Sequence, residues 1–223
     1  MIELHHCLNA RSFRPLWTLE EMGLAYDLKM LPFPPRVRAP EYKKLNPLGT
    51  IPLFLDGPTR MTESSAICHY LATRHGPSPL ALDPSEDDYG AFLNWSYFGE
   101  ATLTFPQTLV LRYARFEPPE RRQPQVAKDY AQWFLARLRA IEATLEGREF
   151  LCAGRFTVAD VSVGYALLLA TTLRLSDEFG PNVTAYWARL QQRDGYRRAQ
   201  AAQRAAAKEA GIDEDPVGAH AAG

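Results

Sequence analysis

The chain has 223 residues, of which 46% are hydrophobic and 23% charged, and its formal net charge is −1. This length allows one large domain or two modest ones with a buried core. The balanced charge argues against a nucleic-acid-binding protein, which normally carries a basic excess. The apolar runs are shorter than the roughly 20 residues of a membrane-spanning helix, and the N-terminus MIELHHCLNARSF lacks the order of a signal peptide. We therefore expect neither a nucleic-acid nor a membrane partner.

The cysteines and histidines do not form a metal or disulfide pattern. Cys7, Cys68 and Cys152 are odd in number, widely spaced and without a CxxC pair. This usage indicates a reducing, cytoplasmic setting, and we expect Cys68 and Cys152 in the core. The adjacent His5 and His6 should point to opposite faces of a strand, so we expect no metal site.

The first 80 residues mix the periods of strands and helices. The predicted elements are a strand at 2–8, a helix from Phe13 that ends before Gly23, a strand at 25–31, a proline- and arginine-rich connector, strands at 51–55 and 60–62, and a helix that ends at Gly76. The order strand, helix, strand, connector, strand, strand, helix predicts an α+β domain.

The rest of the chain reads as helical after a linker, GPSPLALDPS, that is rich in proline and serine. Thr157 and Asp160 have the spacing of a capping box, and the apolar run after them predicts the buried centre of a helical bundle. Residues 196–210 favour an exposed helix. We expect a first domain at 1–77, a linker at 78–85, an all-helical domain at 86–211 and a flexible tail at 212–223.

Pro52 lies inside the strand-like run TIPLFL, although proline cannot donate to a central ladder. Glu63-Ser64-Ser65 follows at the start of a predicted helix. This pair of motifs, the two-domain order and the Thr157–Asp160 box together resemble a cytosolic glutathione transferase, over nearly the whole chain. The resemblance implies a thioredoxin-like first domain in which Pro52 is cis, followed by the helical domain. It also implies glutathione as co-substrate, no further cofactor, and a homodimer.

The resemblance assigns parts of glutathione to parts of the sequence. The start of the helix at Ser64 would bind the γ-glutamyl carboxylate, and Glu63 would take the ammonium group; alternatively, Ser64 or Ser65 is a plain N-cap. A cation of the connector would bind the glycine carboxylate, unless the connector is only a solvated basic loop. The expected glutathione-binding residues are Arg38, Lys44, Thr50, Ile51, Pro52, Glu63, Ser64 and Ser65.

The thiol of glutathione needs a hydrogen-bond donor, because the thiolate is the nucleophile. In this fold the donor comes from the loop after the first strand, which here contains no tyrosine. The candidates are Asn9, Cys7, Arg11 and Ser12. We favour Asn9, whose amide donates at every pH. Cys7 can equally be a buried apolar residue, Asn9 and Ser12 helix N-caps, and Arg11 a surface charge.

An aromatic-rich helix at the start of the second domain supplies the candidates for an apolar second substrate, unless its aromatic stripe only packs against the rest of the domain. The candidates are Trp95, Phe98, Phe105 and Tyr113. Pro106 should kink this helix. The favoured function is the conjugation of glutathione to electrophilic, mostly apolar small molecules, as in detoxification. The alternatives are glutathione-dependent reduction of disulfides or peroxides, for which Cys7 would be the exchange partner, and a non-catalytic ligand-binding protein of the same fold.

Overall fold

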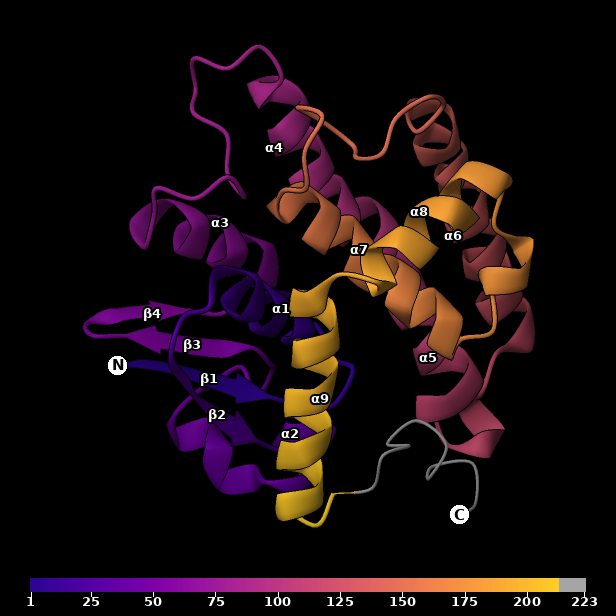
Figure 1. Cartoon of the computed structure of the whole chain (residues 1–223). Helices are drawn as coiled ribbons and strands as arrows, with labels where there is room; N and C mark the ends of the chain where they lie inside the picture. The colour runs from indigo at the N-terminus through magenta and orange to yellow at the C-terminus, as the bar shows by residue number, and fades with distance from the viewer. Residues whose placement is uncertain (213–223) are drawn as a thin grey trace. The chain divides into compact units, whose positions relative to one another are not determined.

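The computed structural model describes residues 1–212, so the predicted tail, apart from Ile212, lies outside the described residues. The chain divides into two compact units. The first contains residues 1–78 and the segment that starts at Gln192, and the second contains residues 79–191 (Figure 1).

The first unit is built on a four-stranded sheet. Its strands are β1 (Ile2–His6), β2 (Tyr26–Met30), β3 (Leu53–Asp56) and β4 (Thr59–Met61), and they lie in the order β2-β1-β3-β4. The β1–β2 pair is parallel and the other two pairs are antiparallel. Helix α1 (Phe13–Met22) connects the parallel strands, and α3 (Ser64–Arg74) follows the β3–β4 hairpin. The predicted α+β order is confirmed.

Helix α1 covers the sheet with a fully buried apolar face that includes Phe13, Leu16 and Trp17. It ends where the sequence predicted, because Gly23 adopts φ 63° and its N–H bonds back to the carbonyl of Glu20. Glycine reaches this left-handed conformation without the steric cost that a Cβ imposes.

The third strand begins two residues later than the sequence suggested. Proline has no N–H for a ladder bond, and pairing with β1 starts at Leu53 rather than Ile51. The Ile51–Pro52 peptide bond is cis. The carbonyl of Thr50, just upstream, accepts the hydroxyl of Tyr42 at 2.9 Å and Nδ2 of Asn46 at 2.7 Å. The short helices of the connector, α2 (Pro35–Arg38) and η1 (Pro40–Lys44), thus hold the chain that enters β3.

Helix α9 (Asp194–Glu209) belongs to the first unit, although the sequence analysis placed it in the helical domain and expected it to be exposed. It lies beside α1 (Figure 1). Its buried residues Tyr196, Ala199, Gln203 and Ala207 recur every three or four positions. The small alanines allow close approach, and the Tyr196 ring packs edge-on against Phe13 and Trp17. Because alanine contributes little hydrophobicity, this face is hard to recognise in the sequence.

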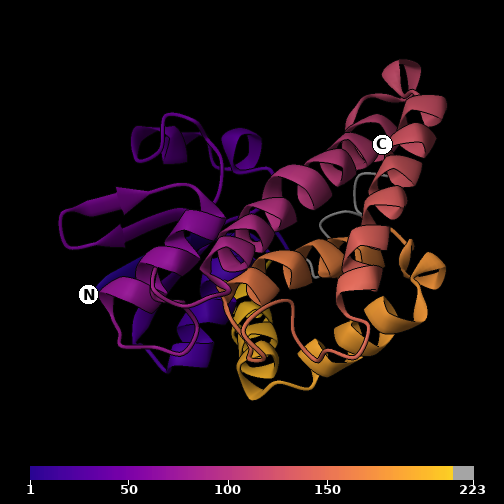
Figure 2. The same cartoon turned by 90° about the horizontal axis from the view of Figure 1, so that it is seen from above.

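Within its described residues the second unit contains helices joined by loops, and no strand. The helices are α4 (Tyr89–Tyr97), η2 (Phe98–Thr104), α5 (Phe105–Leu111), η3 (Arg112–Phe116), η4 (Pro119–Arg121), α6 (Pro124–Thr144), α7 (Val158–Thr172), η5 (Ser176–Glu178) and α8 (Pro181–Gln191). Figure 2 shows that α4 to η3 form one long run, which α6 accompanies in the opposite direction.

Two wide π-helical segments interrupt this long run, Phe98–Thr104 just before Pro106 and Arg112–Phe116 after it. The kink expected at Pro106 stays a prediction. Proline lacks the N–H of a regular helical bond. Side chains satisfy neighbouring carbonyls: the Thr104 hydroxyl donates to Gly99 at 2.7 Å, and Nε2 of Gln107 donates to Leu103 at 3.0 Å.

Helix α7 begins with the predicted capping box. The Thr157 hydroxyl accepts the Ala159 N–H, and the Asp160 carboxylate accepts the Thr157 N–H at 2.8 Å. The hydroxyl of Tyr186 also donates to Asp160, at 2.8 Å. Burial raises the pKa of Asp160 to about 6. Most of α7 is buried, yet no helix within residues 1–212 combines the length and apolarity needed to cross a membrane.

Candidate functional site

The start of α3 differs from a side-chain-capped helix. Glu63 occupies the N-cap position, and its side chain makes no capping hydrogen bond. Ser64 and Ser65 are the first two residues of the helix itself, so the interpretation of either serine as the N-cap is wrong. The backbone N–H groups of a first helical turn have no partner within the helix, and they favour an anion.

A buried cation lies directly behind this helix start. Arg14 of α1 has no exposed surface, and its Nη1 donates to the Ser64 hydroxyl at 3.1 Å. Ser64 is only 3% exposed. Because the Ser64 oxygen accepts this bond, its own hydrogen remains to be donated to another acceptor. The positive charge of Arg14 therefore adds to the field of the helix dipole.

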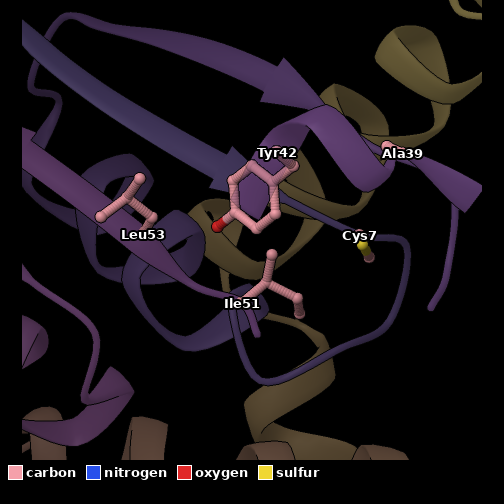
Figure 3. Packing of buried hydrophobic residues seen from close by; sticks show 5 residues of the cluster. All are labelled: Cys7, Ala39, Tyr42, Ile51 and Leu53. Atoms are coloured by element: carbon pink, nitrogen blue, oxygen red, sulfur yellow. The ribbon is translucent and has the colours of Figure 1, made fainter. Parts of the chain in front are cut away.

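Cys7 lies in an apolar cluster beneath the connector. It is fully buried with Ala39, Tyr42, Ile51 and Leu53 (Figure 3). Its Sγ lies 3.8 Å from the carbonyl oxygen of Pro32, and burial raises the pKa of the thiol well above its usual range. A neutral, enclosed thiol is a poor nucleophile. The structure thus places Cys7 in the environment of an inert core cysteine.

Ser12 stands at the N-cap position of α1, yet its side chain does not cap the helix. Its oxygen accepts the Cys7 N–H at 3.3 Å and lies 2.7 Å from Nδ1 of His6. His6 has no exposed surface, and burial lowers its pKa to about 4. The imidazole is therefore neutral at pH 7, and the Ser12 hydroxyl is engaged inside the protein.

Asn9 lies in the loop between β1 and α1 and has φ 52°. Asparagine tolerates this left-handed conformation better than most residues. Its backbone N–H donates to Oε1 of Gln203 at 3.0 Å, and its Oδ1 accepts from Nε2 of the same residue at 2.8 Å. Asn9 is partly accessible, like Arg11, whereas Cys7 and Ser12 are buried.

The connector presents its candidate cations to solvent. Arg38 and Lys44 are exposed, as is Thr50, whereas Ile51 and Pro52 are buried where the chain enters β3. The exposure of Arg38 and Lys44 fits both a binding role and a solvated basic loop.

The aromatic candidates of the second unit fall into two environments. The rings of Trp95 and Phe98 are in edge-on contact at 5.1 Å, which agrees with their predicted common face. Trp95 is nearly buried, at 9% exposure, whereas Phe105 is 56% exposed. Tyr113 is partly exposed.

Three polar residues of the first unit have contacts that were not predicted from the sequence: Arg14, His6 and Gln203. Each is a polar side chain with at most 1% exposure. The available signal was a polar residue on an otherwise apolar or alanine-rich helical face, as with Arg14 beside Phe13 and Gln203 between Ala199 and Ala207. A single sequence does not distinguish such residues from solvated ones.

A sheet domain with a cis-proline before its third strand, joined to an all-helical unit, defines the chain as thioredoxin-like with a helical second domain. Residues 10–74 match the family described as Glutathione S-transferase, N-terminal domain. The chain is 32% identical over 176 residues to Glutathione S-transferase hmp2 of Hypomyces subiculosus, an alignment that covers 74% of this chain and 81% of the relative. The chain therefore belongs to the glutathione S-transferase family, a family of enzymes.

Two further comparisons differ in how much they cover. Glutathione S-transferase 3 of Schizosaccharomyces pombe is 39% identical over 106 residues, which is 46% of this chain and only 43% of that relative. The fold also matches the crystal structure of the glutathione transferase URE2P8 from Phanerochaete chrysosporium with oxidized glutathione. The aligned residues cover 95% of this chain and 97% of the Phanerochaete chain. Its TM-score is 0.81 at 21% identity, a likeness that concerns the fold.

Proposed function

We propose that this protein conjugates glutathione to electrophilic, mostly apolar small molecules, a reaction suited to detoxification. The start of α3 carries the proposal: an acidic N-cap residue, two serines in the first turn, and the buried Arg14 behind them. Membership of the glutathione S-transferase family and the oxidized glutathione in the structure of the Phanerochaete enzyme support glutathione as the ligand here.

The γ-glutamyl end of glutathione would bind at this helix start. Its carboxylate accepts from the N–H groups of the first turn and from the hydroxyls of Ser64 and Ser65, in the field of the dipole and of Arg14. The exposed Glu63 carboxylate pairs with the ammonium group. The two opposite charges of one amino-acid group are thereby both neutralised.

The rest of the peptide would follow the chain into β3. Thr50, Ile51 and Pro52 precede the first ladder pair of this strand, so a peptide in extended conformation can add to the backbone of Ile51. The glycine carboxylate would then reach a connector cation, for which Arg38 and Lys44 are the candidates.

The thiol would lie against the loop between β1 and α1, where we assign the donor to Asn9. The Nδ2 group of Asn9 stabilises the thiolate after the thiol proton passes to solvent. The thiolate then attacks the electrophile, and the new carbon–sulfur bond forms as the leaving group departs. The burial of Cys7 and the engagement of Ser12 with His6 weigh against these two as donors; Arg11 is the remaining alternative.

The apolar electrophile would use the aromatic side chains of the second unit, Trp95, Phe98, Phe105 and Tyr113. Aromatic rings provide large apolar contact areas for a flat organic molecule. We further propose a cytoplasmic homodimer that needs no metal or cofactor besides glutathione. Light scattering should report twice the chain mass of 25.1 kDa.

Calorimetry with glutathione, followed by a conjugation assay with a chlorinated dinitrobenzene, tests the function. Saturable binding together with release of chloride is the expected outcome. Binding without conjugation would favour the ligand-binding alternative, and absence of binding would contradict the proposal. Rapid turnover of a disulfide substrate that is lost in Cys7→Ala would instead support the redox alternative.

A further inference from the structure

Gln203, on the inner face of α9, has a carboxamide with all of its hydrogen-bonding positions used. The side chain is 1% exposed. Its Oε1 lies 3.0 Å from the backbone N of Asn9 and 3.1 Å from Nε2 of His6. Its Nε2 lies 2.8 Å from Oδ1 of Asn9 and 2.8 Å from Oε1 of Gln200. An amide offers two acceptor and two donor positions, so these four contacts saturate it.

The directions of these bonds follow from one fixed donor. A backbone N–H can only donate, so the Gln203 atom that faces the Asn9 N–H must be the oxygen. The Gln203 nitrogen therefore faces Asn9, and because it donates, the atom of Asn9 that it meets must be Oδ1. This orientation leaves Nδ2 of Asn9 on the side of its carboxamide that points away from Gln203.

The donors and acceptors at the start of the loop follow in the same way. Oε1 of Gln203 accepts, so Nε2 of His6 carries a hydrogen, and Nδ1 of the neutral ring accepts from the Ser12 hydroxyl. Ser12 in turn accepts the Cys7 N–H at 3.3 Å. One hydrogen-bond network therefore connects the loop between β1 and α1 to Gln203 on α9. Cys7 joins it through Ser12 and His6, and Asn9 bonds to Gln203 directly.

We propose that Gln203 is a positioning residue for the glutathione thiol: by holding both the backbone and the Oδ1 of Asn9, it presents the Asn9 Nδ2 group to the sulfur. This inference rests on the proposed function of Asn9 as the thiol donor. Without its hydrogen bonds to Gln203, the carboxamide of Asn9 rotates freely about two torsion angles. Either its oxygen or its nitrogen then faces the sulfur. Only the nitrogen stabilises a thiolate, because the oxygen repels it.

The decisive variant is Gln203→Met, which keeps the length of the side chain and removes all four hydrogen bonds of the Gln203 carboxamide. If Gln203→Met does not fold, Gln203→Asn replaces it, because that amide stays polar but is one methylene too short to reach both Asn9 atoms. The matched control is Arg193→Ala, which removes an anchor of α9, the ion pair of Arg193 with Glu21 at 2.8 Å, and leaves Gln203 in place. Asn9→Ala and the double variant Asn9→Ala/Gln203→Met complete the set.

The measurement is the pKa of the thiol in bound glutathione, from ultraviolet titration of the thiolate, together with kcat and KM. Gln203→Met should raise this pKa by at least half as much as Asn9→Ala, and the double variant should add nothing to Asn9→Ala. The KM for glutathione should change little, because Glu63 and Ser64 hold the peptide. In the protein without glutathione, the side-chain amide signals of Asn9 in a nitrogen-15 NMR spectrum should shift in Gln203→Met and stay in place in Arg193→Ala.

Two outcomes would overturn the inference: a thiol pKa that rises in Asn9→Ala but not in Gln203→Met, or an equal rise in Arg193→Ala. In either case Asn9 remains the donor, and Gln203 serves only to dock α9. A thiol pKa that does not respond to Asn9→Ala would contradict the proposed donor itself, and the inference about Gln203 with it.

Discussion

Nη1 of Arg14 donates to the hydroxyl of Ser64 at 3.1 Å, and both side chains are buried. This bond joins the first turn of α1 to the first residue of α3, in the part of the molecule that should bind glutathione. A buried guanidinium needs acceptors for its N–H groups, because each unsatisfied donor costs free energy. Ser64 therefore has a structural role as an acceptor for Arg14, in addition to its proposed role in binding.

Ser64→Ala should lower the free energy of unfolding by about 1–3 kcal/mol, because a buried N–H of Arg14 loses its acceptor. Chemical denaturation measures the change. Thr73→Ala, in the same helix, is the control: the exposed Thr73 hydroxyl bonds back to the carbonyls of His69 at 2.9 Å and Tyr70 at 3.2 Å within the helix itself, and its loss should change little. Equal midpoints for Ser64→Ala and the unmodified protein would show that the Arg14 bond contributes nothing.

Glu63→Ala should weaken glutathione binding about tenfold to a hundredfold, the loss expected for one hydrogen bond to a charged group. The carboxylate is exposed and does not cap α3, so the fold should keep its stability. Calorimetry gives the affinity, and circular dichroism checks the fold. Glu41→Ala, a change of the same kind on the connector, should bind as the unmodified protein does. Identical affinities in both variants would remove Glu63 from the site.

The contrast between Glu63 and Arg14 indicates how far the sequence could predict this site. Ile51-Pro52 and Glu63-Ser64 are local motifs, in which a residue type that is unusual for its element marks a role. Arg14 and Gln203 act across long separations, and Gln203 meets Asn9 only because α9 packs on α1. That packing depends on small alanines and on the edge of the Tyr196 ring, which give no strong hydrophobic period. The strands and the capping box were predictable because their patterns are short-range.

Thr157→Ala should cost about 1 kcal/mol of stability, the usual loss for an N-cap residue. The hydroxyl accepts the Ala159 N–H at 3.3 Å and lies 3.2 Å from the Asp160 carboxylate. The buried helix α7 has few other ways to satisfy its first turn. Thermal or chemical unfolding tests this, with Thr144→Ala, at the exposed end of α6, as the control. Conjugation activity under conditions where both variants are folded should be unchanged, which separates a structural residue from a catalytic one.

Acid should destabilise the protein through His6. Burial lowers the pKa of His6 from 6.5 to about 4 in the folded state, so between these values the unfolded chain binds a proton that the folded chain does not. The stabilising contribution of the neutral ring is complete above pH 6.5 and is lost as the pH falls toward 4, by about 3 kcal/mol in total. His6→Asn provides a reference that does not titrate. The difference in unfolding free energy between the two proteins should shrink in this window; a constant difference would contradict the buried, neutral ring.

The pKa of the bound glutathione thiol should lie below that of the free peptide, at about 8.5 for an ordinary thiol, because Asn9 donates to the sulfur. Loss of a hydrogen bond to a charged group costs about 1.5–3 kcal/mol, so Asn9→Ala should raise the thiol pKa by about one to two units, measured as thiolate absorbance at saturating glutathione. Cys7→Ala should leave both the titration and conjugation nearly unchanged, because Cys7 is buried in an apolar cluster with Tyr42 and Ile51 (Figure 3). Ser12→Ala should act mainly on stability, since its hydroxyl bonds to His6 rather than toward the ligand. If the titration follows Ser12→Ala or Arg11→Ala and ignores Asn9→Ala, the donor is the residue whose loss moved it.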